Sequence, residues 1–399
     1  MSFDVSRVRA FYPALSDEYA WLDAAAGTQV PQTVIDAIAG AYRAGIGNAH
    51  GAFPASARSD AIVAGARRAV ADLVGGVPEG VVLGPNMTTL TYRFATAFAR
   101  GWRPGDQIVL SRLDHDANVR PWVQAAGRAG VEVRWADVEL PSGELPAAQY
   151  EKLVTGRTRL VAVTAASNVL GTMPDVARIS AIAHAAGALT YVDGVHATPH
   201  LPVDVAELGA DLYATSAYKW SGPHIGAVVA APDLLARLVP DKLASAPEEA
   251  PERFETGTLP FADLAGVSAA VDHLAGLDPE ARGSRRARVL ASMAAVRDHE
   301  QAELSHLLKG LAALPSVRLI GSPRRRTATA YFTVEGRTPR EVAEHLAARR
   351  INVWDGHCYA WELTAALGIR DSGSAVRAGL VHYNDRSEVE RLLAALEEL

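Results

Sequence analysis

Cysteine is nearly absent from this chain, because Cys358 is its single thiol in 399 residues. One thiol excludes a disulfide within the chain and a cysteine-rich metal cluster, and we predict no bound metal. Such sparing use of cysteine is typical of a reducing compartment, so we expect a cytoplasmic protein.

Excess positive charge and long apolar runs are also missing. The formal net charge is -6 at pH 7, which leaves no basic field to attract nucleic acid or anionic lipid. No run of about 18 apolar residues occurs, and the amino terminus carries acids in place of the apolar core of a secretory signal. We expect a small-molecule substrate, with no nucleic acid and no membrane as partner.

The residues that are present predict an α/β fold. The chain is long and 49% hydrophobic, which is enough for a large core and more than one domain. Strand-like apolar runs alternate with helical spacing, as in a mainly parallel sheet sandwiched by helices. We predict a large domain over residues 17–276 and a small α+β domain over residues 277–399, against which residues 1–16 pack.

The chemistry is predicted to lie between residues 189 and 230. A short apolar run ends on Asp193, and Lys219 sits in a polar turn before the next run, Ile225 to Ala230. Both groups are expected at the edge of a parallel sheet where open α/β proteins bind ligands. Pyridoxal phosphate needs such a pair, a lysine for a Schiff base and an acid to keep its pyridine nitrogen protonated. For an isolated Asp and Lys, a strand-end cap and a solvated turn residue would be the simpler interpretation.

The surrounding residues favour the cofactor. VDGVHATPHLPVDVAELGADLYATSAYKWSGPHIG, which starts at Val192, resembles the cofactor segment of class V aminotransferases, in particular the cysteine desulfurase branch. The resemblance runs from about Leu22 to the carboxyl terminus and rests on several separated motifs. It implies the fold of pyridoxal phosphate-dependent transferases of fold type I, with the cofactor on Lys219 and its pyridine nitrogen on Asp193.

Three further residues of this segment follow from the resemblance. Ser216 matches a phosphate-binding serine. His196 stands where the family usually has a glutamine bonded to the cofactor's phenolic oxygen; because histidine titrates, we expect the cofactor's electronics to depend more on pH. Tyr218 replaces a phosphate-binding histidine, and its hydroxyl can donate similarly, which suggests a side branch of the family.

A second phosphate contact is predicted where Gly84-Pro85-Asn86-Met87-Thr88-Thr89 joins a strand to a helix. The first amides of a helix have no internal partners and bind anions, although an ordinary cap by Thr88 or Thr89 fits equally well. The resemblance assigns the phosphate to Thr88 and to the backbone of Met87.

Two loop residues complete the predicted cofactor contacts. His115, in Asp114-His115-Asp116-Ala117-Asn118, resembles the histidine that stacks on the cofactor ring, and its usual pKa also suits proton transfer. A helix-capping histidine is the alternative. Asn168, in SNVLGTMP, matches an asparagine that contacts the phenolic oxygen or the substrate carboxylate, whereas asparagine in such loops is otherwise a turn former.

A homodimer is implied by two motifs. Thr258, in Phe254-Glu255-Thr256-Gly257-Thr258-Leu259-Pro260, resembles the threonine that reaches the partner subunit's cofactor phosphate. His50, in a glycine-rich loop, stands where desulfurases carry a histidine that lines the active site, often from the neighbouring subunit, which makes it a candidate substrate-binding residue. A surface histidine is the alternative for His50.

Arg377 is the predicted substrate anchor. With Tyr383-Asn384 it forms the R-x-[SG]-x-x-x-YN pattern of the family, in which the arginine binds the substrate's α-carboxylate in a bidentate manner. An arginine on a solvated strand edge is the alternative.

Cys358 has two interpretations. Desulfurases carry a loop cysteine after glycine and histidine, as in Gly356-His357-Cys358, whose thiolate attacks the substrate sulfur; His357 is then available to lower the cysteine's pKa. Against this, the usual arginine a few residues earlier is replaced by Val353-Trp354-Asp355, and a lone cysteine is more often a small buried hydrophobe. Both interpretations stay open here.

The resemblance implies carbon–sulfur bond cleavage of L-cysteine to alanine and persulfide or sulfide, with catalytic residues Lys219, His115 and Cys358 and with a sulfur-acceptor protein as a further candidate partner. A class V aminotransferase, an amino-acid epimerase and a β-lyase share the same motifs and stay as alternatives. A binding protein that has lost activity is a third class, and the retained Lys219, Asp193 and Arg377 argue against it.

Overall fold

The computed structural model of the chain describes residues 3–399, so Met1 and Ser2 of the predicted amino-terminal segment lie outside the described residues. Its larger sheet has seven strands in the order β2-β8-β7-β6-β5-β3-β4. Neighbours from β4 to β7 pair parallel, whereas β8 pairs antiparallel with both β7 and β2. The bounds are β2 (Val81–Gly84), β3 (Gln107–Ser111), β4 (Glu132–Ala136), β5 (Thr158–Thr164), β6 (Leu189–Asp193), β7 (Leu212–Ser216) and β8 (Gly226–Ala230). The predicted mainly parallel sheet is confirmed.

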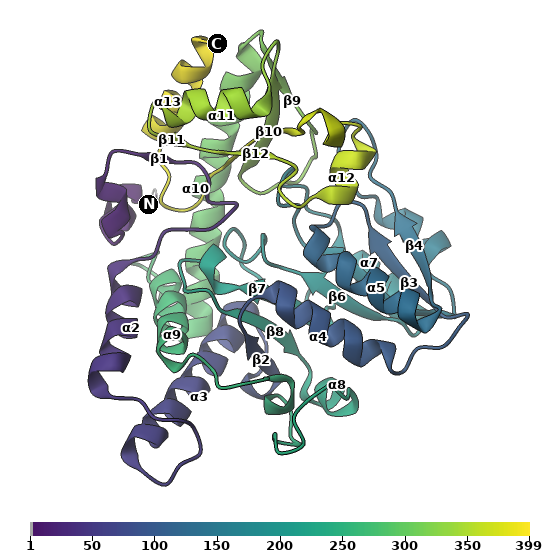
Figure 1. The fold of residues 1–399 in the computed structure, drawn as a ribbon. Coiled ribbons are helices and arrows are strands. Elements are labelled where there is room, and N and C mark those ends of the chain that lie inside the picture. Colours follow the sequence, from purple (N-terminus) through teal and green to yellow (C-terminus); the bar gives the residue numbers. More distant parts are fainter. Residues whose placement is uncertain (1–2) are drawn as a thin grey trace.

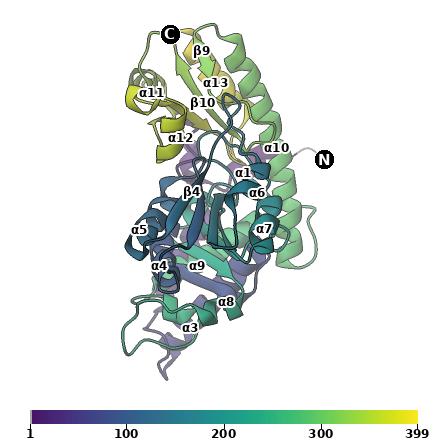
Figure 2. The same ribbon diagram turned by 90° about the vertical axis from the view of Figure 1, so that its right-hand side faces the viewer.

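Both faces of this sheet are covered by helices, which explains why nearly every residue of its inner strands is buried, with no alternation between buried and exposed positions. Along β5, Leu160 and Ala162 face one core and Val161 and Val163 the other, because successive side chains of a strand point to opposite faces. The first core contains α4 (Met87–Ala99) and α5 (Arg120–Ala129); the second contains α3 (Pro54–Val74), α7 (Val176–Ala185) and α9 (Phe261–Ala275). Figure 2 shows α4 and α5 on the opposite side of the sheet from α7.

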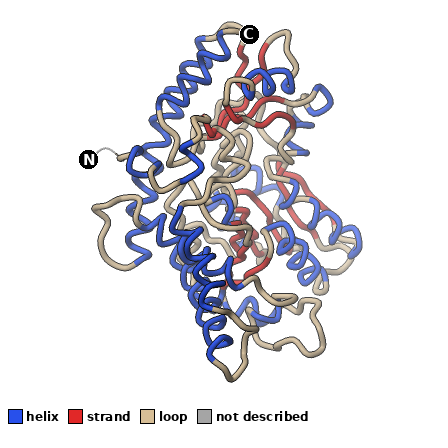
Figure 3. The backbone as a smooth tube through the Cα atoms, turned by 60° about the vertical axis from the view of Figure 1, so that its left-hand side comes forward, coloured by secondary structure: helices blue, strands red, loops and turns tan. Residues whose placement is uncertain are grey.

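A smaller antiparallel sheet has the order β12-β13-β10-β9 and its own core. Its strands are β9 (Val317–Leu319), β10 (Thr329–Val334), β12 (Trp354–Gly356) and β13 (Ala375–Gly379), with helices α11 (Pro339–Ala347) and α13 (Arg386–Glu397). Figure 3 shows the strands in two separate groups, and in Figure 1 the long helix α10 (Arg285–Ala313) runs beside both.

Two short strands form a further pair, since β1 (Ala20–Trp21) lies parallel to β11 (Ile351–Asn352). The next strand, β12, follows β11 after one residue and belongs to the smaller sheet instead. Between β4 and β5 lies a 3₁₀ turn, η4 (Ala147–Gln149), followed by one turn of α-helix, α6. The other elements are α1 (Val5–Arg9), α2 (Gln32–Ala44), α6 (Tyr150–Leu153), α8 (Pro232–Arg237), α12 (Trp361–Ala366), η1 (Pro13–Ser16), η2 (Pro78–Gly80), η3 (Asp116–Asn118), η5 (Ala217–Lys219), η6 (Glu252–Phe254) and η7 (Arg370–Ser372).

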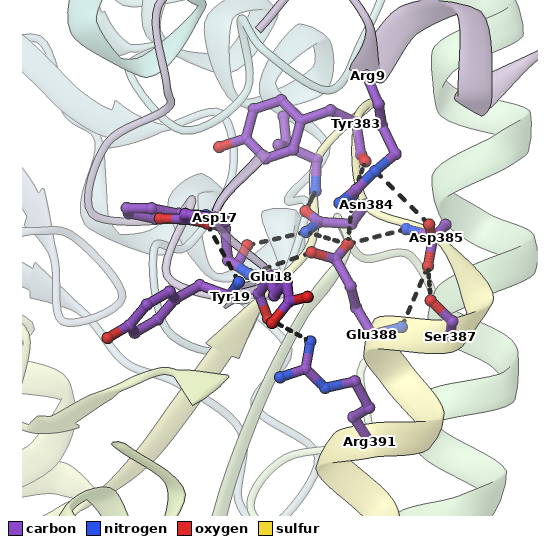
Figure 4. A network of polar contacts seen from close by, with 12 residues as sticks. Arg9, Asp17, Glu18, Tyr19, Tyr383, Asn384, Asp385, Ser387, Glu388 and Arg391 are labelled. Atoms are coloured by element: carbon purple, nitrogen blue, oxygen red, sulfur yellow. Dashed lines mark hydrogen bonds and ion pairs between the residues drawn. The ribbon is translucent and has the colours of Figure 1, made fainter. Parts of the chain in front are cut away.

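One buried carboxylate ties the amino-terminal segment to α13 (Figure 4). Glu388 accepts hydrogen bonds from Arg9 at 2.9 Å, from the Trp21 amide at 3.2 Å and from Asn384 Nδ2 at 3.0 Å. Asn384 also donates to the Trp21 carbonyl at 2.8 Å. The loop that follows β1 is thereby fixed beside the carboxyl end of β13.

Within residues 3–399, no helix combines the length and the apolar character needed to cross a membrane.

Candidate active site

A cavity opens at the carboxyl ends of β5, β6 and β7, since the last residues of these strands, Thr164, Asp193 and Ser216, all line it. This is the edge at which open α/β sheets bind ligands. Of the residues predicted from the sequence, the cavity brings together Met87, Thr88, His115, Asn168, Asp193, His196, Ser216, Tyr218 and Lys219.

Lys219 ends the 3₁₀ turn η5 directly after β7, and its Nζ donates to the Ala25 carbonyl at 2.5 Å. Burial lowers the pKa of Lys219 to about 7, and Arg377 acts in the same direction, whereas Asp193 opposes it. A large part of the amine is therefore neutral near pH 7. A neutral amine is the form that attacks a carbonyl.

Asp193 is buried at the end of β6 and accepts a hydrogen bond from the Val195 amide at 2.9 Å. Burial raises the pKa of Asp193 to about 6, against the opposing effect of Lys219. The group is thus mainly a carboxylate at neutral pH. A buried carboxylate with so few donors suits a cationic ligand atom.

His115 fits the capping interpretation and lies at the cavity where stacking on a cofactor ring is predicted. Its Nδ1 accepts a hydrogen bond from the Ala117 amide at 3.0 Å and caps η3, while the ring also lines the cavity. Burial, followed by Lys219 and Arg377, lowers the pKa of His115 to about 3. The ring is therefore neutral at working pH, which removes the proton-donating imidazolium expected from its usual pKa.

The predicted phosphate end lies at the first turn of α4. The helix cap is Asn86, whose side chain accepts from the Thr89 amide at 2.9 Å, so neither Thr88 nor Thr89 caps the helix. The Met87 amide donates to Ser216 Oγ at 3.0 Å. A Cβ on Gly226 would lie 2.2 Å from the Asn86 carbonyl carbon, so only glycine lets β8 approach this turn so closely.

Tyr218 lines the cavity together with the residues of this turn. Its ring stacks on His224 with centroids 4.8 Å apart and an interplanar angle of 15°. Burial raises the pKa of Tyr218, so its hydroxyl keeps its proton and remains a donor.

The residues fit pyridoxal phosphate by their chemistry. A partly neutral lysine, a carboxylate with one donor, and helix amides beside hydroxyl groups converge on one cavity. The buried Asn168 Oδ1 also lacks a hydrogen-bond partner within residues 3–399. Buried polar atoms are rarely left unpaired, so this oxygen suits a ligand's donor.

Arg377 reaches the same crevice from the smaller sheet, on β13. It is 4% exposed, its Nη1 donates to the Asn168 carbonyl at 3.0 Å, and its Nε has no partner in the described part of the chain. It is not a solvated strand-edge residue. Asp23, which the sequence reasoning missed, lies near Arg377 and Lys219, and burial raises its pKa while these two cations lower it. Its position at the end of an apolar strand, in the sequence LDAAAG, could have identified Asp23 as a site residue.

Cys358 faces the same two cations. Burial raises the pKa of its thiol, and Arg377 and Lys219 partly offset that effect. His357, expected to lower this pKa, instead accepts a hydrogen bond from the Tyr359 amide through Nδ1 at 3.0 Å.

The loop that carries Cys358 is fastened to the larger sheet. Asn168 Nδ2 donates to the Cys358 carbonyl at 2.7 Å, and the Asp116 amide donates to the Tyr359 carbonyl at 2.8 Å. Cys358 and Tyr359 have φ angles of 46° and 59°, which side-chain-bearing residues rarely adopt. Backbone strain of this kind persists only where the surroundings hold it, and here the hydrogen bonds from Asn168 and Asp116 do so.

His50 and Thr258 do not join this cavity. They line a separate surface cavity of about 730 Å³ with residues such as Arg67 and Glu252. His50 is largely exposed, with Nε2 lying 3.4 Å from Glu252. Within one chain, these two predicted residues are therefore apart from the other site residues.

Known proteins resemble the whole chain. The family model for aminotransferase class-V matches residues 20–392. An uncharacterized protein of Mycobacterium tuberculosis is 37% identical over 100% of both chains, and a cysteine desulfurase of Serratia proteamaculans is 32% identical over 100% of this chain and 99% of that one. The crystal structure of the cysteine desulfurase CsdA from Escherichia coli superimposes with a TM-score of 0.88 at 28% identity, covering 100% of this chain and 98% of that one.

Proposed function

The chain belongs to the class-V aminotransferase family and is a pyridoxal phosphate-dependent enzyme; from this premise we propose that it cleaves the carbon–sulfur bond of L-cysteine, as cysteine desulfurases do. The observation that carries the proposal is the position of its single cysteine. Cys358 lies within the electrostatic reach of Lys219 and Arg377, in a loop fastened to Asn168. The proposed nucleophile, amine and carboxylate-binding arginine are thus near enough to influence one another's charge, which supports the proposal.

The cofactor would be held by residues at both ends of the cavity. Asp193 would keep the pyridine nitrogen protonated, and His115 would stack on the ring as a neutral imidazole. His196 and Asn168 would bind the phenolic oxygen. Thr88, Ser216 and Tyr218 would hold the phosphate together with the Met87 amide, which without it donates to Ser216 Oγ. Bound pyridoxal phosphate supplies an electron-accepting ring that stabilises negative charge on the substrate's α-carbon.

Arg377 and Lys219 act on the substrate. Arg377 binds the α-carboxylate through its guanidinium, for which Nε is unpaired among residues 3–399. Lys219 would hold the cofactor, and its free amine would take the proton from the substrate's α-carbon. The lowered pKa of Lys219 supports this role, because a neutral amine is a base near pH 7.

Cys358 accepts the sulfur. Its thiolate attacks the sulfur atom of the bound cysteine and a sulfur–sulfur bond forms. The carbon–sulfur bond breaks, its electron pair stays with the carbon, and the carbon takes up a proton to give alanine. The persulfide then passes to a thiol, for which we propose a sulfur-acceptor protein; the exposed Tyr359, Trp361 and Trp354 beside the loop support a docking surface.

We further propose a cytoplasmic homodimer in which His50 and Thr258 serve the partner subunit's site. Their separation from the cavity of their own chain supports this assembly. The exposed side chains of Phe53 and Tyr42, beside the His50 loop, support a contact there.

The test is incubation of the holoenzyme with L-cysteine, with sulfide and alanine measured in the parent and in Cys358→Ala. A reductant is present to release persulfide sulfur. We expect one alanine per sulfide in the parent and a loss of at least about 100-fold in Cys358→Ala, since a nucleophile is removed. No sulfide from either protein contradicts the proposal.

A carbon–sulfur β-lyase is the second candidate, because burial raises the pKa of the Cys358 thiol and disfavours a thiolate. In that case sulfide leaves with pyruvate and ammonia in place of alanine, and Cys358→Ala keeps its activity. Transamination would require a keto acid, and epimerisation would exchange the α-hydrogen in deuterated water while the sulfur remained bound.

A further inference from the structure

A buried histidine–glutamate pair, used by none of the steps above, lies next to the cofactor cavity. His200 Nδ1 donates to Glu300 Oε2 at 2.7 Å, and the side chains are only 3% and 2% exposed. His200 follows β6 by a short turn, whereas Glu300 comes from the middle of α10, 100 residues away. The pair therefore links the edge of the larger sheet to the long helix.

His196 connects this pair to the cavity. Its ring meets the ring of His200 edge to face, with centroids 4.8 Å apart and an interplanar angle of 65°. Its Nε2 lies 3.0 Å from the hydroxyl of Thr329, at the start of β10 in the smaller sheet. His196 also lines the cavity, and its Nδ1 forms no hydrogen bond within residues 3–399. Two neighbours thus hold the ring, and one nitrogen is free for a ligand.

The His200–Glu300 pair is a poor source of stability. Burying a carboxylate is costly, and a buried pair of charged groups is often no more stable than apolar residues of the same volume. Glu300 Oε1 has no partner in the described part of the chain. Burial raises the pKa of Glu300, and His200 only partly offsets this. Because the pair contributes so little to the free energy of folding, its presence is better explained by the orientation that it imposes on the neighbouring ring of His196.

The surroundings of His196 keep its ring neutral. Burial lowers the pKa of His196 well below its usual range, and His200, Lys219 and Arg377 act in the same direction. Asp193 and Glu300 are the acids on the neighbouring elements. The pH-dependent behaviour expected from a histidine at this position is therefore not supported. A neutral ring has two tautomers, and its contacts decide which nitrogen carries the proton.

We propose that His200 and Glu300 are positioning residues, which hold His196 in the one orientation that presents its free nitrogen to the bound cofactor. Glu300 accepts from His200 Nδ1 and fixes that ring; the ring of His200 and the hydroxyl of Thr329 then fix His196. This inference rests on the cofactor use of the proposed function but not on the cleavage of cysteine. It explains how a histidine replaces the glutamine of the family at this site.

The experiment follows the absorbance of the bound cofactor against pH in the full-length holoenzyme, without substrate. Both the titration midpoint and the absorption maxima are recorded for the parent, Glu300→Leu, Glu300→Gln, His196→Gln and the double variant His196→Gln/Glu300→Leu. We expect Glu300→Leu to move the midpoint by about half a pH unit or more, or to shift the maximum if no midpoint falls in the accessible range. Glu300→Gln retains the parental spectra, because its amide oxygen still accepts from His200 Nδ1.

The double variant distinguishes a positioning role of Glu300 from a general loss of structure. If Glu300 acts through His196, the effect of Glu300→Leu disappears in the His196→Gln background, since the two changes then affect one interaction. The matched control is Glu303→Leu, which removes another buried acid of α10, bonded at 2.7 Å to Arg386. We expect it to lower the melting temperature without changing the titration.

His200→Phe serves as a second variant should Glu300→Leu fail to fold, because it keeps a ring of similar size and removes Nδ1. Parental titrations in Glu300→Leu or in His200→Phe overturn the proposal, as does a shift that persists in the His196→Gln background. These outcomes do not depend on desulfuration. A parent protein without any cofactor absorbance would instead contradict the cofactor assignment itself.

Discussion

At the scale of single residues, burial sets the chemistry of the site. Lys219, Asp193, His115 and His196 have pKa values displaced toward their uncharged forms, and burial is the largest cause for each. For Lys219 the displacement gives a nucleophile near neutral pH, whereas for His115 it removes a proton donor. In solvent, a lysine would stay protonated near neutral pH and a histidine would remain able to donate a proton.

The lowered pKa of Lys219 predicts how fast the cofactor-free enzyme takes up pyridoxal phosphate. Only the neutral amine reacts with the aldehyde, so the rate should rise as the pH passes about 7 and level off above it. Stopped-flow absorbance of the apoenzyme mixed with the cofactor measures this profile. Since Arg377 lowers the pKa of Lys219, Arg377→Gln should move the midpoint to higher pH. An unchanged midpoint in that variant contradicts the electrostatic link.

At the scale of elements, the ends of strands and helices place the reactive groups. Asp193 and Ser216 end parallel neighbours, Lys219 follows one of them, and Met87 begins the helix after β2. The opening strand β1 is held by Glu388 of α13 and by Asn384, which lies just before that helix. The loop after β1 carries both Asp23 and Ala25 to the crevice.

Removal of Glu388 should therefore loosen the opening strand. Glu388→Ala removes the acceptor of the Trp21 amide and one of the acceptors of Asn384 and of Arg9, and we expect it to cost about 3–5 kcal/mol of unfolding free energy. Denaturant unfolding measures this value. Glu390→Ala, an exposed acid of the same helix, should change it by less than about 0.5 kcal/mol. Equal effects of the two substitutions would contradict the role of Glu388.

At the scale of the whole molecule, one chain does not bring all predicted site residues together. His50 and Thr258 lie in their own surface cavity. The division at residue 277 stays a prediction, because α10 contacts α3 and α9 of the larger unit as well as β9, β10 and α13 of the smaller one (Figure 1). Assembly of two chains is the arrangement that we propose for completing the site.

Mixing two defective variants tests that arrangement. Lys219→Ala lacks the amine, and Thr258→Val lacks the hydroxyl that we assign to the partner subunit. In a hybrid dimer, the subunit with Thr258→Val keeps Lys219 and receives Thr258 from its partner, so one of the two sites is complete. We expect mixing after partial unfolding and refolding to restore cysteine cleavage and cofactor absorbance. Activity no higher than the sum of the separate variants means that Thr258 does not cross between subunits.

The sequence by itself determined the family, the cofactor and most lining residues of the cavity. This was possible because each of those residues follows an apolar strand or begins a helix, and a parallel sheet gathers such ends at one edge. The predicted fold, enzyme class and cofactor are confirmed by the family match and the solved relatives.

Only the tertiary structure decided the rest. The helix α4 is capped by Asn86 and not by Thr88 or Thr89, and Asp23 lies near Lys219 and Arg377. Glu300 is hydrogen-bonded to His200, which is 100 residues away in the sequence. The charge states of His115 and His196 could not be predicted from the sequence either. The charge state of each ring depends on how far it is removed from water and on how many cations lie near it. Both are set by the packing of segments that are distant in the sequence, so residue spacing does not reveal them.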